Sequence, residues 1–254
     1  MNRFFHRRGF TLIELLVTIG IIALLIGIAL PALSGAKKRA KDAVGLSNMR
    51  QTGIAMEHYV ARYDGWLPFA IEGTQFNLSP APVVGSVSGS HWELKTYWSS
   101  LFFEVAPWDE WFGVWTYADP RRSEENPWAG SPGFDGPFYA GRTSLEYSRA
   151  LFARPEIWEA GDPIVDRDSV LKGVRMSEVR YPSGKVTLFD TELCIRVRCD
   201  YPSDVKRAML FVDGHAGMHS YKDANAPARA RLEELRTLHE PIHDTAGGAR
   251  GRDY

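Results

Sequence analysis

The residues that most clearly indicate a chemical function lie near the start of the chain, in the run Arg7-Arg8-Gly9-Phe10 and at Glu14. A cut between Gly9 and Phe10 would create a new α-amino group, which is cationic below a pKa of about 8. Glu14 would then be the fifth residue of the shortened chain, where its carboxylate can pair with the amine of Phe10 in a neighbouring copy. Two unit charges about 4 Å apart attract by about 4 kcal/mol at an effective dielectric constant of 20. The simpler alternative is that Glu14 reaches the lipid headgroups.

The residues after Glu14 form an uncharged segment that is long enough to span a bilayer. The run from Leu15 to Leu33 contains no charged residue, and Leu, Ile, Val and Ala dominate it. At about 1.5 Å per residue a helix of this length spans about 28 Å, close to the hydrocarbon thickness of a membrane. A helix also satisfies its own backbone groups in lipid. The composition therefore predicts a transmembrane helix, with a bend at Pro31.

The run from Arg7 to Leu16 resembles the N-terminal signal of type IV prepilins and of type II secretion pseudopilins. The glycine, the aromatic residue, the glutamate and the apolar run occur in the same order, and the resemblance covers about residues 7–65. It implies an α+β, pilin-like fold in which a long N-terminal helix packs on a small antiparallel sheet. It also implies a leader of residues 1–9, cleavage between Gly9 and Phe10, N-methylation of Phe10, a role for Glu14 in filament assembly, and a helix kink at Pro31.

The same resemblance implies the location and the partners of the chain. We expect a single-pass protein of the inner (cytoplasmic) membrane, with its N-terminus in the cytoplasm and its head outside, that later enters a pilus or pseudopilus. The implied partners are the prepilin peptidase, other pilin or pseudopilin subunits in a homo- or hetero-filament, the inner-membrane assembly platform and the lipid bilayer. Basic residues flank the apolar segment on both sides, so the positive-inside rule does not decide the orientation.

Two other interpretations of the N-terminus stay open. A secretory signal peptide would have a basic start, an apolar stretch and small residues before the cut, and Ser34-Gly35-Ala36 can serve as that cut site. The apolar run exceeds the usual length of about 7–15 residues, however, and has Glu14 at its start. The other alternative is an uncleaved membrane anchor.

Residues 34–65 continue the helix with a different pattern. Apolar residues recur at spacings of three, four and seven, which predicts a stripe on one helix face. The helix is expected to cover residues 10–63 and to end at Asp64-Gly65, because glycine readily adopts the left-handed conformation found after helix ends. The stripe consists of Leu46, Met49, Met56, Tyr59, Val60 and Tyr63.

Residues 66–221 form the expected globular head, and its best strand signals come late. Asp213-Gly214 separates two of the apolar runs and predicts a two-residue hairpin. We expect an antiparallel sheet of three or four strands packed on the helix stripe, which is an α+β arrangement. This part also resembles a prepilin-associated group marked by a histidine, nine residues and Asp-Gly, although Ser203 stands where that histidine would be. The strand candidates are residues 185–190, 194–198, 207–212 and about 215–221.

Other residues of the head leave alternatives open. The eight tryptophans, including Trp108, Trp111 and Trp115 at helical spacing, indicate either a packed core or a ligand-binding surface. His215 and His219 lie about 13 Å apart along an extended strand, too far to share one metal ion, so we expect no metal site. Cys194 and Cys199 can form a disulfide only if a turn or bulge brings their Cα atoms within about 7 Å.

The last part of the chain and the overall composition complete the prediction. Residues 222–254 form a tail with a short helix on Leu232, Leu235 and Leu238, and residues 246–254 are expected to be disordered. With 30 basic and 31 acidic residues, the chain is not a generally basic nucleic-acid binder, and we expect no specific nucleic-acid partner.

No nucleophile–base pair or phosphate-binding loop is evident, so we expect no cofactor and no enzymatic activity. The resemblance implies a structural subunit of a type IV pilus or a type II secretion pseudopilus. The alternatives are a minor pilin at the filament tip that binds a ligand through its Trp-rich head, and an exported enzyme.

Overall fold

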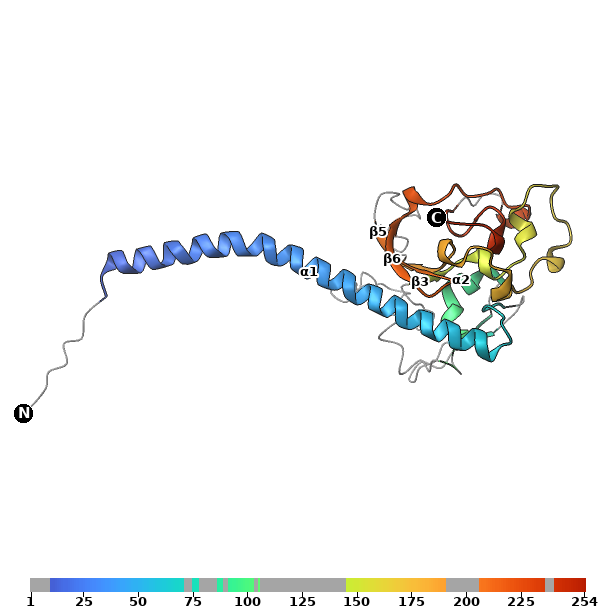
Figure 1. The fold of residues 1–254 in the computed structure, drawn as a ribbon, viewed down its shortest axis with the longest axis horizontal. Coiled ribbons are helices and arrows are strands. Elements are labelled where there is room, and N and C mark those ends of the chain that lie inside the picture. Colours follow the sequence, from blue (N-terminus) through green and yellow to red (C-terminus); the bar gives the residue numbers. More distant parts are fainter. Residues whose placement is uncertain are drawn as a thin grey trace, which may run out of the picture. The chain divides into compact units, whose positions relative to one another are not determined.

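The computed structural model describes residues 10–70, 75–77, 86–88, 91–102, 105, 145–190, 206–235 and 240–254. The chain divides into two compact units, Met1–Lys41 and Asp42–Tyr254, which are described separately here. Helix α1 runs from Leu12 to Arg62 (Figure 1), close to the expected limits, and it continues through Pro31.

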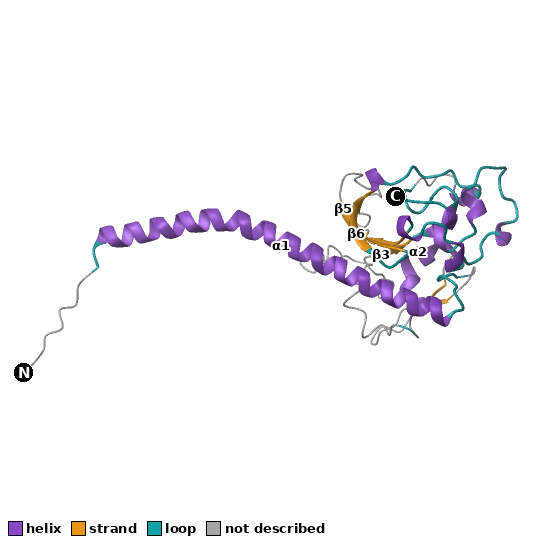
Figure 2. Cartoon of the chain, in the orientation of Figure 1, coloured by secondary structure: helices purple, strands orange, loops and turns teal. Residues whose placement is uncertain are grey.

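The second unit combines the end of α1 with two small antiparallel sheets and several short helices (Figure 2). Strands β1 (Gln75–Asn77) and β2 (Ser86–Ser88) pair with each other, and α2 (Leu94–Tyr97) follows them. The larger sheet has the strand order β3-β4-β5-β6 and is antiparallel throughout. Its strands are β3 (Leu145–Tyr147), β4 (Val186–Asp190), β5 (Lys206–Phe211) and β6 (Ala216–Ser220). The α+β class is therefore confirmed, and β4, β5 and β6 coincide with three of the predicted strands.

One face of the larger sheet packs on the second half of α1, as the apolar stripe predicts. Met49, Met56 and Tyr59 are buried, and they share one core cluster with Leu188 of β4 and Leu210 of β5. Leu46 and Val60 pack against this cluster, whereas Tyr63 remains 36% exposed. The helix ends where predicted, because Asp64 and Gly65 both have positive φ and the Gly65 N–H donates to the Val60 carbonyl at 2.8 Å.

The opposite face of the sheet is also buried, and the last residues of the chain contribute to its cover. In β5 the side chains alternate between the two faces, since Ala208 and Leu210 join the α1 side while Met209 and Phe211 join a second cluster with Ile242. A register shift between Val186 and Leu188 in β4 marks a local irregularity in its pairing with β5.

We call residues 240–254 the C-terminal segment, and its order contradicts the predicted disorder of residues 246–254. Gly248 and Ala249 are buried, and Asp253 is 2% exposed. The backbone N–H groups of Asp253 and Tyr254 donate to the Gly184 carbonyl at 2.8 and 3.1 Å. The prediction is wrong because it weighed only glycine content and polarity, whereas the segment gains its order from sheet contacts and charge pairs.

Two smaller predictions in this unit also need correction. The β5–β6 connection has three loop residues rather than two, because Gly214 N–H donates to the Phe211 carbonyl and Phe211 N–H donates to the His215 carbonyl. Gly214 has φ +84°, the left-handed position of such a three-residue loop. In the tail, the expected helix is only the 3₁₀ turn Glu233–Leu235, with Leu232 and Leu235 buried, and Leu238 lies outside the described residues.

A short exposed loop follows the 3₁₀ helix Pro155–Trp158. Residues 159–163 are all exposed, while Trp158 before them is buried. This loop therefore leaves the packed head directly after a core tryptophan.

Candidate assembly segment and polar clusters of the head

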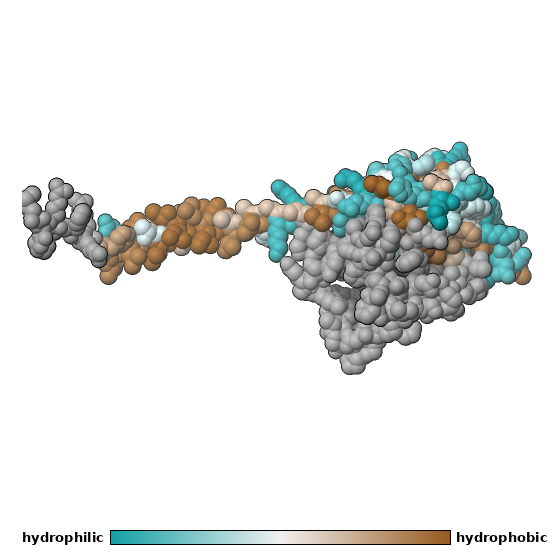
Figure 3. Space-filling view, turned by 90° about the horizontal axis from the view of Figure 1, so that it is seen from below, coloured by the Kyte–Doolittle hydropathy of each residue, from teal (hydrophilic) through white to brown (hydrophobic). Residues whose placement is uncertain are grey.

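We call residues 10–33 the N-terminal apolar segment. Its large apolar side chains have exposed fractions between 50% at Ile26 and 79% at Leu12, and Figure 3 shows this part of α1 as a largely brown, hydrophobic surface. Among the helices in the described part of the chain, α1 is the one that is long and apolar enough to cross a membrane. A solvent-exposed apolar surface of this extent is unfavourable in water, so it is typical of a segment that lies in lipid or against other proteins.

The first turn of α1 is closed by three reciprocal hydrogen bonds between Thr11 and Glu14. The Glu14 N–H donates to Thr11 Oγ1 at 3.3 Å, while Glu14 Oε2 accepts from the Thr11 N–H at 2.9 Å and from the Thr11 hydroxyl at 2.7 Å. Because α1 begins at Leu12, Thr11 is the N-cap residue and Glu14 the third helical residue, which is a capping box. The pattern Thr-x-x-Glu before an apolar run is visible in the sequence, and our sequence analysis missed it.

The other predicted residues of this segment lie as follows. Phe10 precedes α1 and is 72% exposed, whereas Gly9 lies outside the described residues. Pro31 lies inside α1. The Thr18 hydroxyl donates to the Leu15 carbonyl at 2.7 Å, so this donor is satisfied within the helix.

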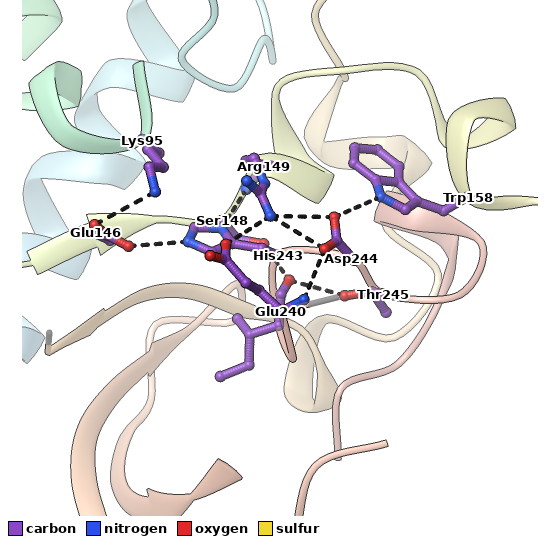
Figure 4. Close-up of polar contacts among 10 residues, drawn as sticks. Lys95, Glu146, Ser148, Arg149, Trp158, Glu240, His243, Asp244 and Thr245 are labelled. Atoms are coloured by element: carbon purple, nitrogen blue, oxygen red, sulfur yellow. Dashed lines mark hydrogen bonds and ion pairs between the residues drawn. The ribbon is translucent and has the colours of Figure 1, made fainter. Parts of the chain in front are cut away.

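A buried polar cluster connects the C-terminal segment to the rest of the head (Figure 4). Arg149 is 2% exposed, and its Nη2 lies 2.7 Å from Glu240 Oε2 and 3.2 Å from Asp244 Oδ2. The Trp158 indole N–H donates to the other Asp244 oxygen, Oδ1, at 3.2 Å. Burial raises the pKa of the Asp244 carboxyl, while Arg149 acts in the opposite direction. Arg149, the Glu240 backbone N–H and the Trp158 indole together oppose the effect of burial on this carboxyl.

His243 extends this cluster toward β3. The Arg149 backbone N–H donates to His243 Nδ1 at 3.2 Å, which makes Nδ1 an acceptor and leaves Nε2 to donate to Glu146 Oε2 at 3.1 Å. Glu146 in turn lies 3.8 Å from Lys95. Burial, and then the charge of Arg149, hold the pKa of His243 well below its ordinary value. His243 is thus a neutral, positioned imidazole at neutral pH.

A second buried ion pair lies at the start of β4. Lys185 Nζ is 3.3 Å from Asp253 Oδ1, and their side chains are 0% and 1% exposed. The Thr245 hydroxyl is hydrogen-bonded to both groups, and the Val186 N–H donates to Asp253 Oδ2 at 2.8 Å. Burial lowers the pKa of the Lys185 ammonium, and Asp253 opposes this shift.

Three further residues that the sequence analysis singled out, Asp213, His215 and His219, lie close together at the β5–β6 hairpin. Asp213 Oδ1 contacts His215 Nδ1 at 2.5 Å, while His215 and His219 both contact the ring of Phe211, at centroid distances of 4.1 and 5.1 Å. Within the described ranges, no group of three or more His, Cys, Asp or Glu residues is arranged to hold a metal ion. The predicted residues outside the described part of the chain are Trp108, Trp111, Trp115, Cys194, Cys199 and Ser203.

Comparison with known proteins identifies the N-terminal region. The family model of the prokaryotic N-terminal methylation motif matches residues 5–30. A search of curated proteins and a search of solved structures each found no match to the chain. The matched residues include the expected cleavage position, Thr11 and Glu14, and they extend into the apolar helix. This chain therefore carries a type IV prepilin-like N-terminal signal, a methylation motif that leads into one long apolar helix.

Proposed function

We propose that this chain is the precursor of a structural subunit of a type IV pilus or a type II secretion pseudopilus. The observation that carries the proposal is the position of the methylation motif directly on a helix whose apolar side chains are exposed all round from Leu12 to Leu33. Such a helix is stable in lipid before assembly. After assembly it packs against the equivalent helices of other subunits, in either a homo- or a hetero-filament.

The prepilin signal implies processing by the prepilin peptidase, and we place the cut between Gly9 and Phe10. Phe10 is exposed and lies before the first residue of α1, so the bond on its N-terminal side is not part of the helix. The cut leaves Thr11 and Glu14 in place, so the mature chain keeps its capping box. N-methylation of the new amine of Phe10 follows in this proposal.

Glu14 has two roles in the proposed mechanism. Both hydrogen bonds that it accepts from Thr11 end on Oε2, so Oε1 remains for the amine of Phe10 in a neighbouring subunit. That pairing compensates the cost of a carboxylate in the apolar layer, about 2.5–3.5 kcal/mol for acidic residues at the centre of a spanning helix. It also sets the axial position of one subunit relative to the next during addition at the assembly platform.

The described tryptophans favour the structural role over ligand capture at the filament tip. Trp98 and Trp158 are almost fully buried, and their indole N–H groups donate to the Leu145 carbonyl and to Asp244. Trp92 is partly buried against the core, and the half-buried Trp66 contacts the ring of Phe69 and the Arg175 guanidinium. These rings are therefore packing residues, and the prepilin signal favours a structural pilin over an enzyme.

The proposal is tested first at the cut site. We expect the mature chain from membranes to begin at N-methylated Phe10 by mass spectrometry, and Gly9→Val to leave the longer precursor. Gly20→Val is the matched control, because no heavy atom lies within 4 Å of a Cβ built at Gly20. A native chain that starts at Met1 or near Lys37, or normal processing of Gly9→Val, would contradict the proposal.

The second test separates the two roles of Glu14. Glu14→Gln keeps a side chain suited to a capping box but removes the charge, whereas Glu14→Ala removes both. We expect both variants to insert into the membrane and both to be lost from filaments isolated from cells with a tagged copy. Normal incorporation of Glu14→Gln would show that the charge pair between subunits is not needed.

A further inference from the structure

The buried pair of Lys185 and Asp253 has the components of a condensation reaction. A primary amine lies 3.3 Å from a carboxyl oxygen, and both side chains are excluded from solvent. The Val186 N–H donates to Oδ2, where it would stabilise negative charge that develops on that oxygen during attack at Cγ. The Thr245 hydroxyl contacts both Nζ and Oδ1 and so provides a path for a proton between them.

The backbone holds the two reactants in place. The backbone N–H groups of Asp253 and Tyr254 both donate to the Gly184 carbonyl, so the residue before Lys185 is hydrogen-bonded to the C-terminal segment that carries Asp253. A Cβ at Gly184 would lie 2.8 Å from the Tyr254 carbonyl oxygen, so a side chain there would prevent this close approach. Fixing an amine and a carboxyl group in this way converts a bimolecular reaction into an intramolecular one.

The surroundings penalise the charge of the Lys185 ammonium. Two opposite charges removed from water pay a large desolvation cost, which a condensation would remove. Burial also lowers the pKa of Lys185, which favours the uncharged amine that acts as the nucleophile. The buried pair of Arg149 and Asp244 offers an internal comparison, because a guanidinium remains protonated and does not act as a nucleophile.

We propose that Lys185 and Asp253 condense to an intramolecular amide that links the start of β4 to the C-terminal segment. One proton first moves from Nζ to the carboxylate, directly or through Thr245, which leaves a neutral amine and a carboxylic acid. Nζ then forms a bond to Cγ, and the C–Oδ1 bond breaks. A second proton from Nζ leaves with Oδ1 as water, so the ammonium–carboxylate pair becomes one amide and one water with no oxidant or co-reactant.

The test is a tryptic map of the full-length chain extracted from membranes in detergent. An acylated Lys185 resists trypsin, so the linked product is peptide 181–196 joined to the peptide that begins at Asp253, with a mass lower than their sum by one water. We expect this branched peptide in the wild type and the complete loss of it in Lys185→Arg. That variant keeps the charge, and trypsin still cleaves after position 185.

A second variant tests the proton path without removing either reactant. Thr245→Val keeps the approximate shape of the side chain but lacks the hydroxyl, and we expect a larger unlinked fraction in a time course after refolding. Recovery of only the unlinked peptides from folded wild-type protein would overturn the proposal, as would a branched peptide in Lys185→Arg. The wild-type measurement needs no variant to fold, and its outcome is independent of pilus assembly.

Discussion

The N-terminal apolar segment and the C-terminal segment differ in composition and in where their partners lie. The first is uncharged from Leu15 to Leu33, and its side chains are exposed within its own chain. The second is rich in glycine and charge, yet Asp244 and Asp253 are almost fully buried in contacts with Arg149 and Lys185. Polarity along the sequence is therefore a poor guide to burial in this chain, because what decides burial is whether a side chain has a partner of matching chemistry.

The strongest test of this difference between the two segments is to remove the C-terminal segment. Truncation before Glu240 leaves two buried cations without carboxylates, at about 3–5 kcal/mol each, and also uncovers Phe189 and Phe211. Since a whole domain is stable by only about 5–15 kcal/mol, we expect the head to lose its cooperative unfolding transition. The measurement is urea unfolding of the full chain in detergent, followed by tryptophan fluorescence.

The matched control for truncation lies in the other segment. Leu25→Ala removes a side chain that is 60% exposed, so the unfolding midpoint of the head should not change. A wild-type unfolding transition in the truncated chain, or a large shift of the unfolding midpoint in Leu25→Ala, would contradict this difference between the two segments.

A single substitution tests the polar cluster. Asp244→Ala removes one of the two carboxylate partners of Arg149 and the acceptor of the Trp158 indole N–H, while Glu240 still pairs with Arg149, and we expect a loss of about 1–3 kcal/mol in the free energy of unfolding. Arg149→Met in the same chain should cost less than the sum of the two single substitutions, because Arg149 and Asp244 contact each other directly. Additive losses in the double variant would show that the two groups do not act as a pair.

A smaller effect is expected from pH, because the free energy of unfolding should decrease as the pH falls. Because burial holds the pKa of His243 well below about 6.5, the unfolded chain takes up a proton that the folded chain does not. The stabilisation is fully present above about pH 6.5 and should decrease by about 1.4 kcal/mol for each pH unit below it.

Urea midpoints between about pH 7 and pH 5 measure this slope, and His243→Gln should reduce it. Part of the slope will persist in that variant, because burial also lowers the pKa of His219. An unchanged slope in His243→Gln would assign the pH dependence to other groups.

The smallest expected effect concerns the cap of α1. Thr11→Val removes the hydroxyl that accepts from Glu14 N–H, which should cost about 1 kcal/mol in the first helical turn. Faster hydrogen exchange at Leu12 to Glu14, with no change in the head, is the expected result. Thr18→Val is the control, since its hydroxyl only donates to a carbonyl inside the helix.

Much of the fold could be predicted from local patterns. The apolar stripe of α1 and strands β4, β5 and β6 follow from periodicity, and the signal near Gly9 follows from residue order. These features depend on neighbouring residues alone, so a single sequence is enough to find them.

The rest depended on contacts between distant residues. The run Arg207–Phe211 is almost continuously apolar, which indicates a strand buried on both faces and therefore a second cover for the sheet. That cover includes Ile242, and its charge pairs join residues about a hundred positions apart, as in Arg149 and Asp244. No local pattern predicts such a pairing, and the Gly-rich composition after Asp244 predicts disorder instead.

The exposed loop at residues 159–163 has a practical consequence for labelling the head. An epitope or fluorophore placed near Asp253 competes with buried hydrogen bonds, and one placed near Phe10 interferes with the proposed processing site. The loop lies outside both regions, and its polar contacts are the exposed pair of Glu159 with Arg250 and the Asp162 carbonyl, which accepts from Arg231. A dye attached at an exposed side chain of residues 160–163 therefore labels the head without replacing a buried partner of the C-terminal segment or a residue near Phe10.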